Sequence, residues 1–144
     1  MTDFSNCIVG FVFEFGKIQN RSMAVEITVN GEKKITVVPH DKSIIDVEVE
    51  LNLPCVLELN FFGKNNNTDT IVDESGKIIS DMYVKIQSIS IDGFPCGPKF
   101  LHQTLALTTM SGERHVTSYI GFNGVMKIEL LEDNVISQFG SMNQ

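Results

Sequence analysis

Apolar and polar residues alternate along most of this chain with the two-residue period of a β-strand. Four runs in the first half are the clearest examples: Cys7 to Phe15, Met23 to Val29, Ile45 to Leu51 and Cys55 to Phe61. Alternate apolar residues place one face of a strand against a core and leave the other face to water. These runs therefore predict a core built from sheets.

Two Asn-Gly dipeptides mark predicted turns. Asn30-Gly31 separates Met23–Val29 from a partner strand, Glu32–Val38, and Asn123-Gly124 precedes the run Val125–Leu131. A type I′ turn needs positive φ at both central residues, which Asn and Gly tolerate, so this dipeptide between alternating runs indicates a hairpin. We expect both turns to be needed for folding.

The middle of the chain is organised around a long polar loop. Gly63 to Asp81 contains a small hairpin that turns at Asp73–Gly76, and the strand Tyr83–Ile91 leaves the loop and ends at Asp92-Gly93. Within that strand the apolar phase changes, which favours a β-bulge near Gln87-Ser88 over burial on both faces.

Further strands are predicted at Phe100–Thr109 and His115–Ile120, and one short helical turn around Val135 and Ile136. The total is about ten short strands, with no amphipathic helix, and this spacing is typical of a sandwich or a barrel. We predict an all-β fold, a single-domain jelly-roll-like β-sandwich of about ten short antiparallel strands over residues 1–144.

The charge of the chain argues against nucleic acid as a partner. The chain has eleven Lys and Arg and eighteen Asp and Glu, which gives a formal charge of −7. The basic residues do not form the cluster that binding to a phosphate backbone requires. No apolar run reaches the length of a membrane span, and no basic segment opens the chain, so we expect no membrane partner and synthesis in a reducing cytoplasm. The three cysteines, Cys7, Cys55 and Cys96, are predicted to be buried free thiols.

Carboxylates and amides in the long loop supply the oxygen chemistry of a calcium site. Asp69, Asp73 and Asp81 are the candidate ligands, beside Asn65-Asn66-Asn67. Their spacing does not match an EF-hand, and Asp and Asn in long loops commonly bond their own backbone as turn formers. We favour the turn interpretation and expect no metal or other cofactor.

Aromatic residues are the candidates for ligand binding. The chain has no Trp, and Tyr83, Tyr119 and Phe122 are the candidate ligand-binding residues. Phe62, Phe94 and Phe122 lie next to turns and could face outward, although packing at the edge of the core is the favoured interpretation for each.

No catalytic motif is present. His40, His102 and His115 lie far apart in the sequence, beside no nucleophile with an orienting partner, and we expect structural or surface roles for them. A hydrolase with two carboxylates needs no sequence proximity between them, but nothing in the sequence selects such a pair. We therefore predict that the protein is not an enzyme.

Two sets of positions resemble known families. The run Met23–Gly31 and the strand end Ile89–Gly93 resemble jelly-roll carbohydrate-binding modules, especially the small calcium-dependent modules that bind xylan. A longer pattern is similar to small β-sandwich proteins of tailed bacteriophages, particularly those of marine bacteria and cyanobacteria. That pattern is Asp69-Thr70-x-x-Asp73-x-x-Gly76-x-Ile78-x-x-Asp81, Ile89-x-Ile91-Asp92-Gly93 and Tyr119-x-Gly121-Phe122-Asn123-Gly124.

The phage resemblance implies a non-enzymatic virion structural or accessory protein, either capsid decoration or a tail or fibre component, that acts by protein–protein assembly. It implies other virion proteins as partners, a homo-oligomer, and location in the virion after synthesis in the host cytoplasm. The alternative is a carbohydrate-binding module for attachment to the host surface, with a glycan as partner. A glycan hydrolase is the third class.

Strand edges provide a hypothesis for assembly. The strand that carries Asp46, Glu48 and Glu50 has a charged face that guards an edge, whereas Cys7–Phe15 carries only Glu14 as a charge. We expect the segment from the N-terminus through about Phe15, together with the tail near Phe139, to make contacts between subunits.

Overall fold

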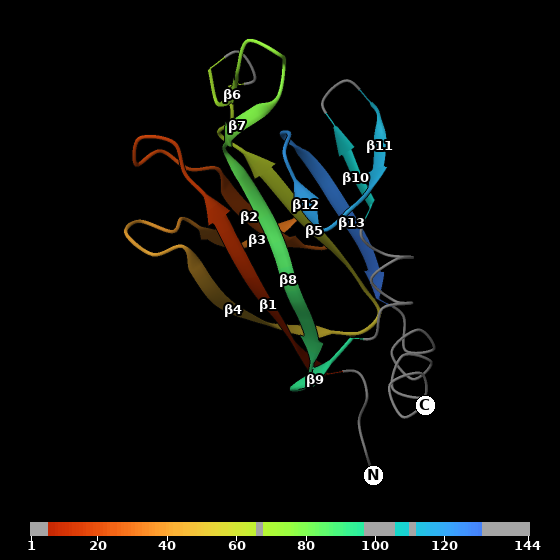
Figure 1. Cartoon of the computed structure of the whole chain (residues 1–144). Coiled ribbons are helices and arrows are strands. Elements are labelled where there is room, and N and C mark those ends of the chain that lie inside the picture. Colours follow the sequence, from red (N-terminus) through yellow and green to blue (C-terminus); the bar gives the residue numbers. More distant parts are fainter. Residues whose placement is uncertain (1–5, 66–67, 97–105, 110–111, 131–144) are drawn as a thin grey trace.

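The computed structural model describes residues 6–65, 68–96, 106–109 and 112–130, which form thirteen strands and no helix. Two antiparallel sheets stack face to face as a β-sandwich (Figure 1), which confirms the predicted fold class. Within the described ranges, no helix has the length and hydropathy that a membrane crossing requires.

The first sheet has five strands. Its main path runs β12 (Tyr119–Ile120), β8 (Tyr83–Ile91), β1 (Asn6–Gly16) and β4 (Ile44–Asn52), and β9 (Phe94–Pro95) also pairs with β8. All of these pairings are antiparallel.

The second sheet has six strands. Its order is β11 (Arg114–Val116), β10 (Ala106–Thr109), β13 (Gly124–Leu130), β5 (Cys55–Phe62), β2 (Ala24–Val29) and β3 (Glu32–Val37). A separate two-stranded hairpin, β6 (Thr70–Val72) and β7 (Ile78–Asp81), projects beyond the sheets at the end opposite β9 (Figure 1).

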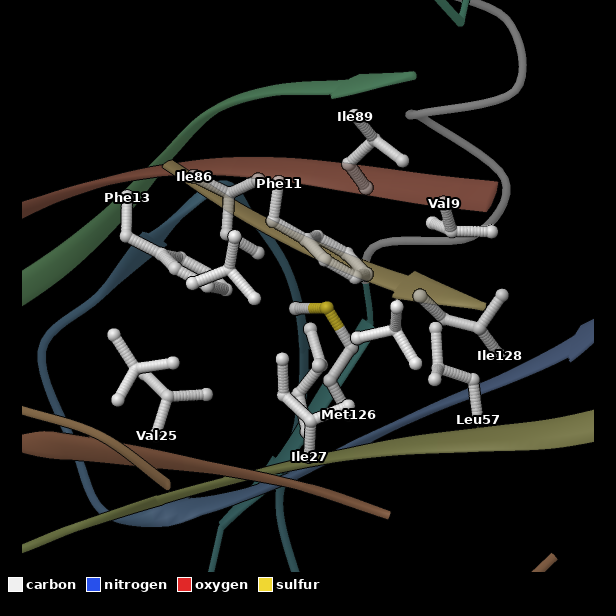
Figure 2. Packing of buried hydrophobic residues seen from close by; sticks show 14 of the residues in the cluster. Val9, Phe11, Phe13, Val25, Ile27, Leu57, Ile86, Ile89, Met126 and Ile128 are labelled. Carbon is white, nitrogen blue, oxygen red and sulfur yellow. The ribbon is translucent and has the colours of Figure 1, made fainter. Parts of the chain in front are cut away.

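The core lies between the sheets and follows the predicted alternation. Phe11 and Phe13 of β1 point toward Ile27 and Leu57 of the opposite layer (Figure 2), and all four side chains are at most 1% exposed. The rings of Phe11 and Phe13 stack with centroids 5.5 Å apart. Each fully buried side chain of this size contributes roughly 1.5–3 kcal/mol to folding, so the interlock of the two faces is the main source of stability.

The predicted thiols are confirmed as free and buried: Cys7, Cys55 and Cys96 form no disulfide. Burial raises the pKa of Cys7 and of Cys96 to about 11, so both stay protonated near neutral pH.

Several predicted turns are confirmed. Asn30 and Gly31 have φ of 51° and 82° between β2 and β3, as a type I′ hairpin requires. Asp73–Gly76 turns between β6 and β7, and Asp92-Gly93 turns between β8 and β9. The predicted bulge is also present, because Val12 pairs with Ser88 while Phe13 pairs with Ile86, which leaves Gln87 as the extra residue.

The prediction of a hairpin at Asn123-Gly124 was wrong. The expected single strand His115–Ile120 is two strands, β11 and β12, which belong to different sheets. Because β12 and β13 also lie in different sheets, Asn123-Gly124 connects the two layers rather than two neighbouring strands. Neither residue has positive φ.

The hypothesis that the first strand offers an open edge was also wrong. β1 pairs with β4 on one side and with β8 on the other, so its backbone groups are used within the sheet. β4 does form an edge, as its acidic face predicts. The described residues do not include the segment before β1, the tail near Phe139, the helical turn at 135–136 or the start of the strand at 100–105.

The Asn30-Gly31 turn provides a test of the fold. A Cβ at Gly31 would meet no atom within 4 Å, so the substitution Gly31→Val strains only the backbone. We expect it to lower the free energy of unfolding by about 1–2 kcal/mol, the cost of left-handed φ for an L-residue. Denaturant unfolding measures this difference. Gly31→Asn is the control and should cost less, since Asn tolerates positive φ; equal stability of the wild type and the Val variant would show that the turn is of another type.

Candidate functional site

A cleft of about 660 Å³ opens between the β6–β7 hairpin and the segment that runs from β11 toward β13. Thr70, Ile78 and Asp81 line it from the hairpin, residues 114–117 line it from β11 and the following loop, and Lys64 lines it from the segment that follows β5. The hairpin and β11 belong to different sheets, so the cleft is assembled from parts that are distant in the chain.

A buried ion pair lies in the wall of this cleft. The Lys64 ammonium lies 2.6 Å from Asp81 Oδ1, and the two side chains are only 2% and 11% exposed. Lys64 Nζ also donates to the carbonyl oxygen of Gly121 at 2.6 Å. The charge of Lys64 is therefore balanced within the protein and is not free for a ligand.

The backbone of Lys64 is held in turn by Asn123. Lys64 N donates to Asn123 Oδ1 at 3.0 Å, and Asn123 Nδ2 donates to the Lys64 carbonyl at 2.7 Å. These two bonds extend the ladder between β5 and β13 beyond its last pair, Phe61 with Gly124. Asn123 of the Asn-Gly dipeptide thus ties its own loop to the segment after β5, and the dipeptide makes no hairpin turn.

Asp81 accepts hydrogen bonds from three side chains. Thr70 Oγ1 and Lys64 Nζ donate to Oδ1 at 2.7 and 2.6 Å, and the Tyr119 hydroxyl donates to Oδ2 at 2.5 Å. Burial alone raises the pKa of Asp81, but the hydrogen bonds from Lys64, Tyr119 and Thr70 and the charge of Lys64 outweigh it and lower the pKa. Asp81 is therefore a carboxylate at neutral pH.

Two stacked tyrosines support the cleft. The rings of Tyr119 and Tyr83 lie 4.7 Å apart, and the Tyr83 hydroxyl donates to Glu14 Oε2 at 3.0 Å. Gly16, which pairs with Tyr83 across β1 and β8, leaves room for that ring, since a Cβ there would lie 2.1 Å from it. Burial, followed by the hydrogen bond to Asp81, raises the pKa of Tyr119, so its hydroxyl keeps the proton that it donates.

Phe122 presents an exposed ring to the cleft. It is 51% exposed, and its plane lies within 17° of the imidazole plane of His115, with centroids 6.4 Å apart. The Lys64 ammonium lies 5.6 Å from the Phe122 centroid, within cation–π range. The cleft therefore combines exposed aromatic faces with a polar network that is already satisfied.

The three candidate calcium ligands lie in three separate hydrogen-bond networks. Asp69 is fully buried, with Oδ1 2.6 Å from Arg21 and Oδ2 accepting from Asn65 N at 2.8 Å. The bond from Asn65, then that from Arg21, lowers the pKa of Asp69. Asp73 accepts from Ser75 and from the backbone of Lys77, which is the predicted turn role.

The described residues do not fit a calcium site. No group of three His, Cys, Asp or Glu side chains converges among them, and both Asp69 and Asp81 are already neutralised by a cation. A calcium ion needs six to eight oxygens that are available to it, so these aspartates would first have to lose their present partners.

The predicted aromatic candidates divide into two groups. Tyr119 and Phe122 line the cleft, whereas Tyr83 stacks behind Tyr119 and is not a lining residue. The expectation of packing at the core edge for Phe62, Phe94 and Phe122 was wrong, because their side chains are 38%, 58% and 51% exposed.

The sequence did not identify Lys64, Arg114 or His115 as site residues. In the sequence Lys64 is a lysine beside an asparagine run. Its role depends on contacts with Asp81 and Gly121, which lie 17 and 57 positions further along the chain. His115 was expected to be structural or on the surface, and it lies beside Phe122 in the cleft. Only the pairing of distant segments reveals these roles.

No family model and no curated protein matches the sequence. Two solved structures share the fold. One, described as vCBM60 in complex with galactobiose, has a TM-score of 0.55 and 13% identity, over 85% of this chain and 97% of that chain. The other is a selenomethionine form of vCBM60, with a TM-score of 0.55 and 14% identity, over 87% of this chain and 91% of that one.

The description of the second structure concerns a circular permutation that links two families of calcium-dependent carbohydrate-binding modules. At this identity the likeness concerns the fold alone, and at that level the predicted resemblance to carbohydrate-binding modules is supported. Neither structure is described as a virion protein, so the assignment to a phage particle stays a prediction. The chain shares the β-sandwich architecture of carbohydrate-binding modules.

Proposed function

We propose that this protein is a non-catalytic carbohydrate-binding module that holds a sugar in the cleft between the β6–β7 hairpin and β11. The observation that carries the proposal is the exposed ring of Phe122, together with Tyr119, beside a fixed network of polar groups in one concave site. The volume, about 660 Å³, lies in the range of sites that enclose small ligands.

The chemistry of the cleft suits the two kinds of surface on a sugar. A pyranose ring has apolar C–H faces, which pack on aromatic rings, and a rim of hydroxyls, which need hydrogen-bond partners. Phe122 and Tyr119 supply exposed rings, and Thr117 and the one remaining acceptor position of Asp81 supply polar atoms. The similarity of fold to a module solved with galactobiose supports the same class of ligand.

The shortage of carboxylates in the described cleft favours binding over hydrolysis. A glycosidase needs two carboxyl groups, about 5–9.5 Å apart, of which one stays protonated as the acid. Asp81 is the sole carboxylate among the described lining residues, and its pKa is lowered rather than raised. The described cleft therefore provides neither the second carboxylate nor the acid.

The predicted partners and location are not needed for this proposal. Membership of a virion, self-association and host attachment remain predictions, and a sugar-binding module is compatible with the last of them. The purified protein can be tested for binding without knowledge of its biological setting.

The substitution Phe122→Ala tests the aromatic contact. An oligosaccharide array first identifies a glycan that the wild type binds, and calorimetry then measures its affinity for each variant. We expect Phe122→Ala to weaken binding of that glycan roughly tenfold, because loss of one aromatic face costs on the order of 1.5 kcal/mol. Phe94→Ala is the matched control, since Phe94 is also an exposed phenylalanine but lies on β9 at the other end of the sandwich (Figure 1). Equal losses in both variants, or no binding by the wild type, would contradict the proposal.

Removal of divalent ions tests the role of calcium. Because Asp69 and Asp81 are paired with Arg21 and Lys64, we expect a chelator to leave the melting temperature unchanged. A ligand that binds only the native state raises its stability, so loss of a bound ion would lower the melting temperature. A clear drop that added calcium reverses would show that a metal site is present and that the loop carboxylates change partners to form it.

A further inference from the structure

One cation in the cleft pairs with none of the residues that the structure describes. The lining contains Lys64, Arg114 and His115 as basic residues and Asp81 as the acid. Lys64 is paired with Asp81, and His115 Nε2 lies 3.3 Å from Glu113 Oε2. The guanidinium of Arg114, by contrast, forms no ion pair or hydrogen bond with any residue in the described part of the chain.

The position of Arg114 brings its charge to the same cleft as the exposed aromatic rings. Arg114 opens β11, at the edge of the six-stranded sheet, and its side chain is exposed. The cleft that it lines is the one that contains Tyr119 and Phe122. A sugar that packs on these rings would therefore have the guanidinium beside it.

We propose that the cleft selects an acidic sugar, a hexuronate, whose ring packs on the aromatic residues and whose carboxylate pairs with Arg114. This inference rests on the proposed sugar-binding function and names its ligand class. The planar guanidinium presents parallel N–H donors that match the two oxygens of a carboxylate. A neutral sugar would leave that charge unused.

The acidic face of β4 lies too far from the cleft to oppose this selection. The chain carries a formal charge of −7, but the acidic face of β4 lies at the opposite edge of the five-stranded sheet from β12. Three strand spacings separate the two strands, roughly 14 Å. Charges at that distance are largely screened at physiological ionic strength, where the Debye length is about 8 Å.

The experiment compares one sugar backbone with and without its charge. Calorimetry measures the binding of oligogalacturonate and alginate oligosaccharides, of their methyl esters, and of neutral galacto-oligosaccharides to the full chain. We expect an acid to bind at least about tenfold more tightly than its ester, because a charge-assisted bidentate contact is lost on esterification. Raising the salt concentration should narrow this difference.

Two variants assign the contact. We expect Arg114→Gln to remove the preference for the acid over the ester, while Lys33→Gln preserves it. Lys33 is the matched control because it is also an exposed cation, on β3 at the opposite edge of the six-stranded sheet, and its loss changes the net charge equally. The melting temperatures of both variants show that they are folded.

The outcomes separate the two proposals. Equal binding of acids and esters, or an acid preference that survives Arg114→Gln, would overturn the selection of a hexuronate while the sugar-binding function stands. Binding of sulfated oligosaccharides alone would overturn the choice of a carboxylate as the anion. Failure of every acidic, esterified and neutral sugar to bind would refute the sugar-binding function itself.

Discussion

The ion pair between Lys64 and Asp81 holds together the end of the sandwich where the cleft lies. The β6–β7 hairpin forms its own two-stranded sheet, and an isolated hairpin of this kind is marginally stable in water. It is attached through Asp81, bound to Lys64, and through Asp69, bound to Arg21 and to the backbone near Asn65. Because removal of Lys64 from its buried pair would leave the charge of Asp81 uncompensated, at a cost of about 3–5 kcal/mol, this ion pair fixes the position of the hairpin and so the shape of the cleft.

The same network holds the aromatic side chains of the cleft in place. The hydroxyl of Tyr119 is fixed by Asp81, and its ring is fixed by stacking on Tyr83, whose own place depends on the absence of a side chain at Gly16. Side chains that are already ordered lose little conformational entropy when a ligand arrives, so more of the contact energy appears as affinity. The residues that a ligand would meet are thus held by residues that it would not touch.

The two solved structures that resemble this chain show how far a shared fold extends. The description of one of them concerns calcium-dependent carbohydrate-binding modules, whereas Asp69 and Asp81 of this chain are paired with Arg21 and Lys64. A fold supports different sites, so the ligand chemistry must be argued from the side chains that line the cleft. In this protein those side chains are aromatic rings, polar groups that are bonded to one another and the guanidinium of Arg114, and the proposed sugar binding is argued from them.

The sequence by itself determined most of the longer strands, several turns and the core faces, because period-two alternation and the positive φ of a residue such as Gly31 are local properties. It also placed Asp73 correctly as a turn former. Only the tertiary structure decided that β11 and β12 belong to different sheets, and that Asn123 clamps a loop 59 residues away rather than turning a hairpin. The site of Lys64, Asp81 and Arg114 exists because the stacking of two sheets brings the ends of distant strands together, and no local pattern encodes which strand ends will meet.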